Sequence, residues 1–138
     1  MSKRSRACEF SQKVREQIKE RDQGCIFCRL GYMLPPEDEF VTMTGRYQIM
    51  HFIPRSHGGL GIPENGAVGC LWHHNMLDNG NRDNRDDMLI LFEAYLRARH
   101  KDWDKKKLTI RFRKRKKFRN RKNRYRSSAG FTDMLIYL

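Results

Sequence analysis

Residues 48–80 read QIMHFIPRSHGGLGIPENGAVGCLWHHNMLDNG, and this stretch decides the fold that we expect. It holds four of the five histidines of the chain and one of its four cysteines. The β-branched and aromatic residues at 46–53 predict a strand, and a second short strand is expected near AVG at 67–69, after a glycine-rich loop. The LWHHNMLD at 71–78 predicts a short helix. We therefore expect two strands and a helix that carry most of the imidazoles of the protein.

The sequence on either side of this stretch predicts further helices. Apolar residues recur at helical spacing over 10–22, which is typical of an amphipathic helix. A second helix is expected over 87–100, capped by Asp86 or Asp87, and its apolar face should belong to the core. Residues 30–45 contain two adjacent prolines and an acidic cluster, so they are expected to be mostly loop. This mixture predicts the α+β class.

Two pairs of residues have the spacing of a zinc knuckle. Cys25 and Cys28 form one Cys-x-x-Cys pair, and Cys70 with His73 forms a second pair of the same spacing. Two intervening residues allow both ligands of a pair to face one ion, so the four predict a tetrahedral Zn²⁺ site. His74 competes with His73 for the fourth position, and the symmetry of the pairs favours His73. The alternative is that the cysteines are buried free thiols.

A second set of polar residues comprises His51, Asn65 and His74. The pattern HFIPRSHGG, then ENG, then C-x-x-HH resembles the motif of the HNH endonucleases, with Asn65 fourteen residues after His51 and His74 nine residues further on. The resemblance covers roughly residues 10–112. It implies a ββα-metal core, stapled here by the zinc knuckle and flanked by N- and C-terminal helices.

The resemblance also implies an activity and a role for each residue. His51 would be the general base, because an imidazole titrates near neutrality. His74 would hold a catalytic Mg²⁺, Mn²⁺ or other divalent ion. Asn65 would fix the loop and the backbone of His51. The expected reaction is hydrolysis of DNA phosphodiester bonds that leaves 5′-phosphate and 3′-hydroxyl ends.

One residue departs from the HNH pattern. Most members of that family carry Asp, Glu or His directly before the base histidine, where the side chain binds the metal, whereas this chain has Met50. A thioether is a poor ligand for Mg²⁺ or Mn²⁺, so we expect Met50 to mark an emptied ligand position. Asp78 lies four residues after His74, on the same helical face, and could supply the missing carboxylate. The alternative is that Asp78 only caps or solvates the end of the helix.

The positive charge of the chain is concentrated near its C-terminus. Residues 105–126 contain fourteen of the 29 Lys and Arg residues and no acid, which leaves 15 basic against 16 acidic residues elsewhere. Such a block predicts contact with a polyanion, and we expect DNA. The alternative is a solvated tail. The predicted DNA contacts are Arg55, Arg113, Lys114, Arg115, Lys116, Lys117, Arg119 and Arg121.

Two regions are expected, a nuclease domain with its zinc knuckle over 1–112 and a basic tail over 113–138. KLTIRFR at 107–113 alternates and could form a strand that ends the domain. Without an 18-residue apolar run or a secretion signal we expect no membrane span and a cytoplasmic location, the host cytoplasm for a phage-encoded chain.

Two other functions stay open. The chain could be a zinc-knuckle protein that binds DNA without cutting it. It could also be an accessory subunit that acts only with a terminase or another phage protein, docked through the apolar FTDMLIYL at 131–138. Retention of both His51 and His74 favours a nuclease, because a pure binder would need neither imidazole.

Overall fold

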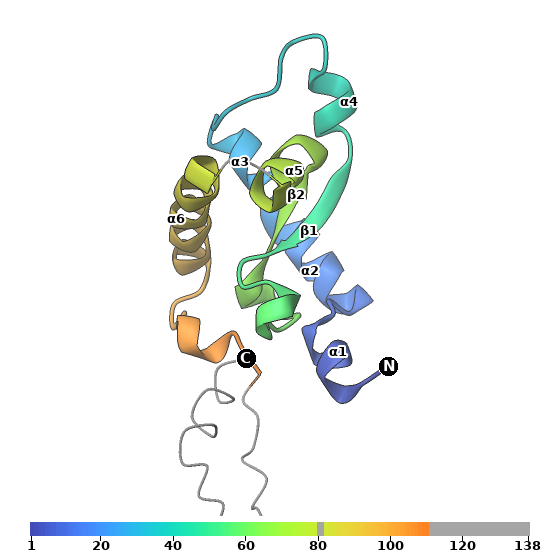
Figure 1. Ribbon diagram of the computed structural model, residues 1–138, viewed down its shortest axis with the longest axis vertical. Helices are drawn as coiled ribbons and strands as arrows, with labels where there is room; N and C mark the ends of the chain where they lie inside the picture. Colours follow the sequence, from blue (N-terminus) through green and yellow to red (C-terminus); the bar gives the residue numbers. More distant parts are fainter. Residues whose placement is uncertain (80–81, 111–138) are drawn as a thin grey trace, which may run out of the picture.

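The computed structural model describes residues 1–79 and 82–110 (Figure 1). Within these residues the helices, the 3-10 helices (η) and the strands follow one another in the order α1 (Lys3–Cys8), α2 (Gln12–Asp22), α3 (Ile26–Arg29), α4 (Phe40–Thr44), β1 (Tyr47–His51), η1 (Arg55–His57), η2 (Pro63–Asn65), β2 (Gly66–Cys70), α5 (Leu71–Asn79), α6 (Arg82–Arg99) and η3 (Lys105–Lys107).

An antiparallel ribbon of β1 and β2 lies at the centre of the fold. Met50 pairs with Ala67 and His51 pairs with Gly66, so the two strands are joined over their whole length. α5 follows β2 directly and packs against both strands, while α6 packs against α5. Figure 1 shows α4 at one end of the molecule, and the N-terminus and η3 at the opposite end.

The ribbon separates two apolar cores, because successive side chains of a strand point to opposite faces. Met50 and Ala67 belong to the larger core, which they share with residues of α3, α5 and α6. Val68 belongs to the smaller core, where it meets Phe10 and Ile18 from the α2 side. Each face of the ribbon is therefore covered by helices. The largest fully buried side chains of the larger core outside the ribbon are Phe27, Phe92, Ile26, Met88, Leu96 and Leu108.

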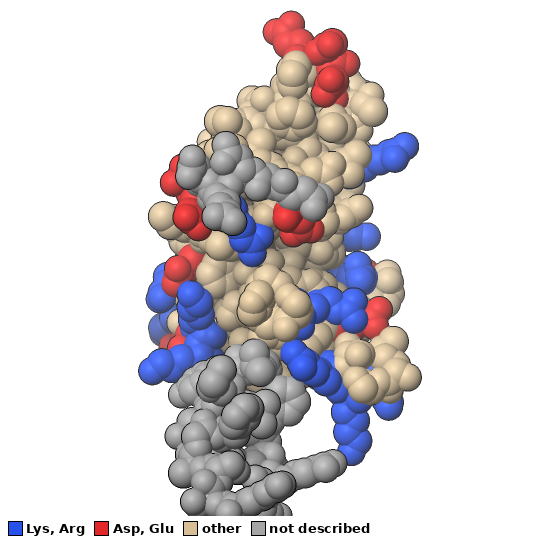
Figure 2. All heavy atoms as spheres, viewed as in Figure 1, with Lys and Arg blue, Asp and Glu red and all other residues tan. Residues whose placement is uncertain are grey.

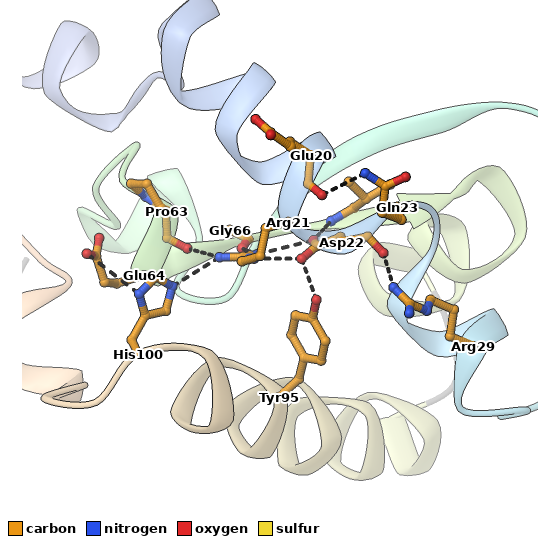
Figure 3. A network of polar contacts seen from close by, with 11 residues as sticks. Glu20, Arg21, Asp22, Gln23, Arg29, Pro63, Glu64, Gly66, Tyr95 and His100 are labelled. Atoms are coloured by element: carbon orange, nitrogen blue, oxygen red, sulfur yellow. Dashed lines mark hydrogen bonds and ion pairs between the residues drawn. The ribbon is translucent and has the colours of Figure 1, made fainter.

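A buried ion pair at the end of α2 connects three elements (Figure 3). The side chain of Asp22 is fully buried, and one of its carboxylate oxygens lies 2.6 Å from Nε of Arg21. The same carboxylate accepts hydrogen bonds from the backbone N–H of Val68 in β2, at 2.8 Å, and from the hydroxyl of Tyr95 in α6. Arg21 in turn donates to the carbonyl of Gly66 at 2.7 Å. Asp22 thus holds α2, the ribbon and α6 together.

The same network extends to His100, the residue that follows α6. Nη1 of Arg21 lies 3.1 Å from Nε2 of His100. A guanidinium only donates, so Nε2 accepts this hydrogen bond and carries no proton. Burial lowers the pKa of His100, against an opposing effect of the Glu64 carboxylate, and the imidazole is therefore neutral near pH 7.

The α+β class expected from the sequence is the class that the structure shows. The helix expected over 10–22 is α2, the strands expected at 46–53 and near 67–69 are β1 and β2, and the short helix expected over 71–78 is α5. The three elements β1, β2 and α5 thus follow one another as the pattern in residues 48–80 predicts.

Four details differ from the sequence expectations. α1 was not expected, and its first turn is capped by the Ser2 hydroxyl, which accepts from the N–H of Ser5 at 3.0 Å. α4 interrupts the expected loop at 30–45. α6 begins at Arg82, before the expected caps, where a hydrogen bond from Arg85 to the carbonyl of Leu77 joins it to α5. Residues 107–110 form no strand apart from an isolated bridge between Gly59 and Thr109.

No helix within residues 1–79 and 82–110 is both long and apolar enough to cross a bilayer. The predicted tail at 113–138 lies outside the described residues, and so do the last three residues of the possible strand at 107–113.

Candidate functional site

Three cysteines and one histidine converge where the end of β2 meets α3 and α5. Gly24, at a φ of +130°, turns the chain out of α2. Cys25 is then the N-cap of α3, and Cys28 lies within its single turn. Cys70 is the last residue of β2, and His73 lies one turn into α5. The four ligand atoms all lie within 4.8 Å of one another. The junction of β2 and α5 thus faces α3, although Cys28 and Cys70 are 42 residues apart in the sequence.

The distances between the ligand atoms suit a tetrahedral ion. Sγ of Cys28 lies 3.7 Å from Sγ of Cys70, and Nδ1 of His73 lies 3.5, 3.4 and 3.2 Å from the sulfurs of Cys25, Cys28 and Cys70. Tetrahedral zinc bonds would separate two sulfurs by about 3.8 Å and a sulfur from a nitrogen by about 3.6 Å. A disulfide would need about 2.05 Å, and all four cysteines are free thiols. The group could therefore hold a metal ion such as zinc.

A backbone carbonyl orients the histidine of this group. Nε2 of His73 lies 2.6 Å from the carbonyl oxygen of Tyr32. A carbonyl only accepts, so Nε2 carries the proton and Nδ1 presents its lone pair to the thiols. Metal-binding histidines are ordinarily held in this way by a second polar group. The structure brings His73, and not His74, to the three cysteines.

The surroundings of the thiols keep two of them protonated when no cation is bound. The hydrogen bond between the thiols of Cys25 and Cys70, together with burial, raises the pKa of Cys25 to about 11. Burial and the neighbouring Cys25 raise the pKa of Cys28 to about 11. The same hydrogen bond from Cys25 lowers the pKa of Cys70. A cation bound by three thiolates must displace these protons, so binding should strengthen as the pH rises.

His51 ends β1 and is half-buried on the face of the ribbon that carries Phe10. Its Nε2 lies 2.8 Å from the carbonyl oxygen of Cys8, at the end of α1. This bond fixes the proton on Nε2 and leaves Nδ1 as an acceptor. The Phe10 ring lies against the imidazole, with ring centroids 4.2 Å apart. His51 is thus held in one tautomer and one orientation.

Burial and the neighbouring arginines keep the ring of His51 neutral. Burial lowers the pKa of His51, and the guanidinium groups of Arg55 and Arg15 lower it further. The hydrogen bond to Cys8 and the carboxylate of Asp78 act in the opposite direction. The ring is therefore an unprotonated base near pH 7, which suits the role expected from the sequence.

His74 and Asp78 lie together on α5, as their spacing predicts. Nε2 of His74 lies 3.3 Å from a carboxylate oxygen of Asp78, and both side chains are accessible, with 25% and 51% of their surface exposed. Asp78 is also near enough to His51 to influence its pKa. The imidazole of His74 and the carboxylate of Asp78 thus lie side by side on α5. Within residues 1–79 and 82–110, however, the only group of three or more such ligands is the cysteine cluster.

Asn65 closes the loop between β1 and β2. It is fully buried, its Oδ1 accepts from the N–H of Ile53 at 2.8 Å, and its Nδ2 donates to the carbonyls of Ile53 and Leu60 at 3.1 and 2.8 Å. These bonds use both amide hydrogens. We expected contact with the backbone of His51, but the bonds go to residues two and nine positions further on. Asn65 therefore positions the loop that follows β1.

Met50 is a residue of the larger core and not an empty ligand position beside His51. Its side chain is 1% exposed, in the larger core. It occupies the space over Gly69 of the paired strand, where a Cβ would collide with the sulfur of Met50. Because neighbouring strand residues face opposite sides, Met50 points away from the face on which His51 meets Phe10. This corrects the expectation of an emptied ligand position next to His51.

The predicted DNA contacts divide into one described residue and seven that are not described. Arg55 is exposed in η1 and near His51. The residues outside the described part of the chain are Arg113, Lys114, Arg115, Lys116, Lys117, Arg119 and Arg121.

Three features of the site could not be anticipated from the sequence. They are the carbonyl of Cys8 at His51, the carbonyl of Tyr32 at His73, and the approach of Arg15 to His51. Backbone carbonyls are present at every residue, so no sequence signal could have marked the first two. Arg15 has the appearance of an ordinary charge on the solvent face of an amphipathic helix.

Comparison with models of protein families, with curated proteins and with solved structures finds no match to this chain.

Proposed function

We propose that this chain is a metal-dependent DNA endonuclease of the HNH type. The observation that carries the proposal is the arrangement around His51. Its Nε2–H is held by the Cys8 carbonyl, which leaves Nδ1 free to accept a proton, and Asp78 of the His74–Asp78 pair lies near enough to act on its charge. A base of this kind beside an imidazole and a carboxylate that could together hold a divalent ion suits hydrolysis of a phosphodiester bond.

The residues of the chain would act as follows. Nδ1 of His51 takes a proton from a water molecule, and the water oxygen attacks phosphorus as the 3′-oxygen departs. The products are 5′-phosphate and 3′-hydroxyl ends, and solvent returns a proton to the leaving oxygen. Bound Mg²⁺ or Mn²⁺ supplies stabilisation of charge on that oxygen, and His74 with Asp78 would hold it. Asn65 keeps the loop after His51 in place.

The cysteine cluster is proposed to be a structural Zn²⁺ site. All four ligands come from the chain, which is typical of closed structural zinc sites. The ion would join α3 to the junction of β2 and α5. The DNA affinity would come from Arg55 and from the basic residues of 105–126, because phosphate contacts give affinity without sequence information.

A plasmid-cleavage assay with a panel of divalent metals tests this function. The full chain should cut DNA with Mg²⁺ or Mn²⁺, and His51→Ala should reduce the rate by about 10²–10⁴-fold. The matched control is His57→Ala, a histidine six residues further on that is exposed and whose Nδ1 lies 3.3 Å from the Ser56 hydroxyl. Equal activity of His51→Ala and His57→Ala in nuclease-free preparations would refute the proposal.

One observation favours a second candidate, a metal-stapled protein that binds DNA without cutting it. HNH relatives carry a metal ligand at the position of Met50, which is here a buried core residue. Only His74 and Asp78 would then remain as protein ligands for a catalytic ion. This candidate requires DNA binding by the full chain with no cleavage under any metal of the panel.

A further inference from the structure

Two arginines from distant parts of the sequence lie at the turn that follows β1. Arg55 lies in η1, four residues after His51, and is near enough to lower its pKa. Nη2 of Arg4 in α1 lies 3.4 Å from the carbonyl oxygen of Ser56, the next residue after Arg55. The N-terminal helix thus brings a second guanidinium to the turn that follows β1.

A third arginine approaches from α2. Nε of Arg15 donates to the carbonyl of Phe10 at 3.1 Å, and the ring of Phe10 lies against the imidazole of His51. Arg15 is also near enough to lower the pKa of His51. Arginines of α1, α2 and η1 therefore gather on one edge of the molecule, and we call Arg4, Arg15 and Arg55 the arginine rim.

The rim differs from the structural arginines of this protein. Arg21 lies against the buried carboxylate of Asp22. Among the side chains that the structure describes, by contrast, neither Arg15 nor Arg55 lies at ion-pair distance from a carboxylate. Glu9 is the only acid in residues 1–15. Figure 2 shows most of the Lys and Arg side chains of this face over the half that carries α1, with a few acidic side chains among them and others at the opposite tip.

We infer that Arg15 and Arg55 bind the phosphodiester backbone of DNA next to His51, with Arg4 bringing α1 to the same edge. Arg15 and Arg55 both lie near His51, neither forms an ion pair with a described carboxylate, and like charges held close together raise the free energy of the folded state unless an anion joins them. Guanidinium groups match phosphate oxygens in geometry and in charge. The inference rests on the proposed function and extends the contact predicted at Arg55 to a phosphate-binding surface of the folded domain.

Salt-dependent binding to a short DNA duplex tests the rim. Arg15→Gln and Arg55→Gln are made in the full chain with His51→Ala, so that no cleavage disturbs the measurement. Removing one arginine–phosphate interaction should reduce the log–log salt slope by about 0.9, so the fall in affinity from 50 to 200 mM salt should be roughly 3.5-fold smaller for each variant. The matched control is Lys19→Gln, one turn along α2, where the side chain is exposed beside Tyr47 and Val68. Lys19→Gln should leave the slope unchanged.

The outcomes separate the rim from the nuclease itself. Unchanged salt slopes of DNA binding in Arg15→Gln and Arg55→Gln would overturn the inference. An equal reduction of the slope in Lys19→Gln would also overturn it, because it would indicate a non-specific attraction between DNA and the positive charge of the whole domain. If wild type then still cuts DNA and His51→Ala does not, only the rim has failed. Reduced slopes in a chain that never cuts DNA would support the rim as a phosphate site and refute the nuclease. Because Arg55 is exposed, its variant also keeps the test valid where Arg15→Gln disturbs α2.

Discussion

Nε2 of His51 lies 2.8 Å from the carbonyl oxygen of Cys8, 43 residues earlier in the chain. The bond fixes the tautomer of the proposed base through the backbone of a helix that the sequence did not lead us to expect. Because the acceptor is a carbonyl, substitution of the Cys8 side chain leaves it in place. The orientation of His51 therefore depends on the packing of α1 against the ribbon.

The rate of cleavage should depend on pH as a neutral imidazole base requires. The rate should rise with pH and reach a plateau below neutrality, because burial first, and then the neighbouring arginines, lower the pKa of His51. Arg55→Gln removes one of these cations, so it should raise the pKa of His51 and shift the increase in cleavage rate to higher pH. Profiles of kcat/KM over about pH 5 to 8 measure both effects. A rate that falls with rising pH, or a profile unmoved in Arg55→Gln, would contradict this.

One ion per chain should be bound by the cysteine cluster. Cys70→Ser should lose the ion and the cooperative unfolding transition, since closed metal sites couple directly to folding. Cys8→Ser is the matched control, because Cys8 is equally buried but lies outside the cluster. Elemental analysis should find zinc in the wild type and in Cys8→Ser after an EDTA treatment that stops cleavage. A folded wild type without zinc would show that the site has another use.

Asp78→Asn should raise the Mg²⁺ or Mn²⁺ concentration needed for half-maximal cleavage by about tenfold or more. The expectation follows from the 3.3 Å approach of its carboxylate to His74 and from the preference of hard ions for carboxylates. Asp86→Asn makes the same change at an exposed position of α6 and should leave metal dependence unchanged. Metal titrations of the cleavage rate decide the matter. Wild-type dependence in Asp78→Asn would leave His74 as the sole protein ligand.

Asp22→Ala should destabilise the fold by roughly 3–5 kcal/mol, because it leaves the guanidinium of Arg21 without its carboxylate in a largely buried position. Tyr95→Phe removes a single hydrogen bond to the same carboxylate and should cost roughly 1.5–3 kcal/mol. Urea unfolding of the zinc-loaded proteins measures both values. Equal destabilisation in the two variants would show that the ion pair contributes little beyond that one bond.

Removal of residues 113–138 should weaken DNA binding and flatten its salt dependence. The removed segment carries most of the Lys and Arg residues of the basic block at 105–126. Each phosphate group that the shortened chain no longer neutralises should lower the log–log slope by about 0.9. Cleavage at saturating DNA should survive, since no proposed catalytic residue lies in the segment. A truncated chain with the full salt slope would show that the affinity resides in the folded domain alone.

The chemistry of the candidate sites was readable from local spacing. Cys25 with Cys28, Cys70 with His73, and His74 with Asp78 are short-range pairs, so the geometry of one turn determines how each pair faces. The structure brings both zinc-type pairs to one point and places His74 beside Asp78. The strands and the short helix of 48–80 were predictable for the same reason.

Tertiary packing decided everything that depends on which chain segments meet. The sequence determined the α+β class, the ligand spacings and the position of the charge, because these are properties of neighbouring residues. It did not show that Met50 fills the space over Gly69, that Asn65 holds Ile53 and Leu60, or that Cys8 orients His51. Burial of a side chain and the acceptor of a buried N–H are set by residues far away in the chain, and only the folded structure brings those residues together.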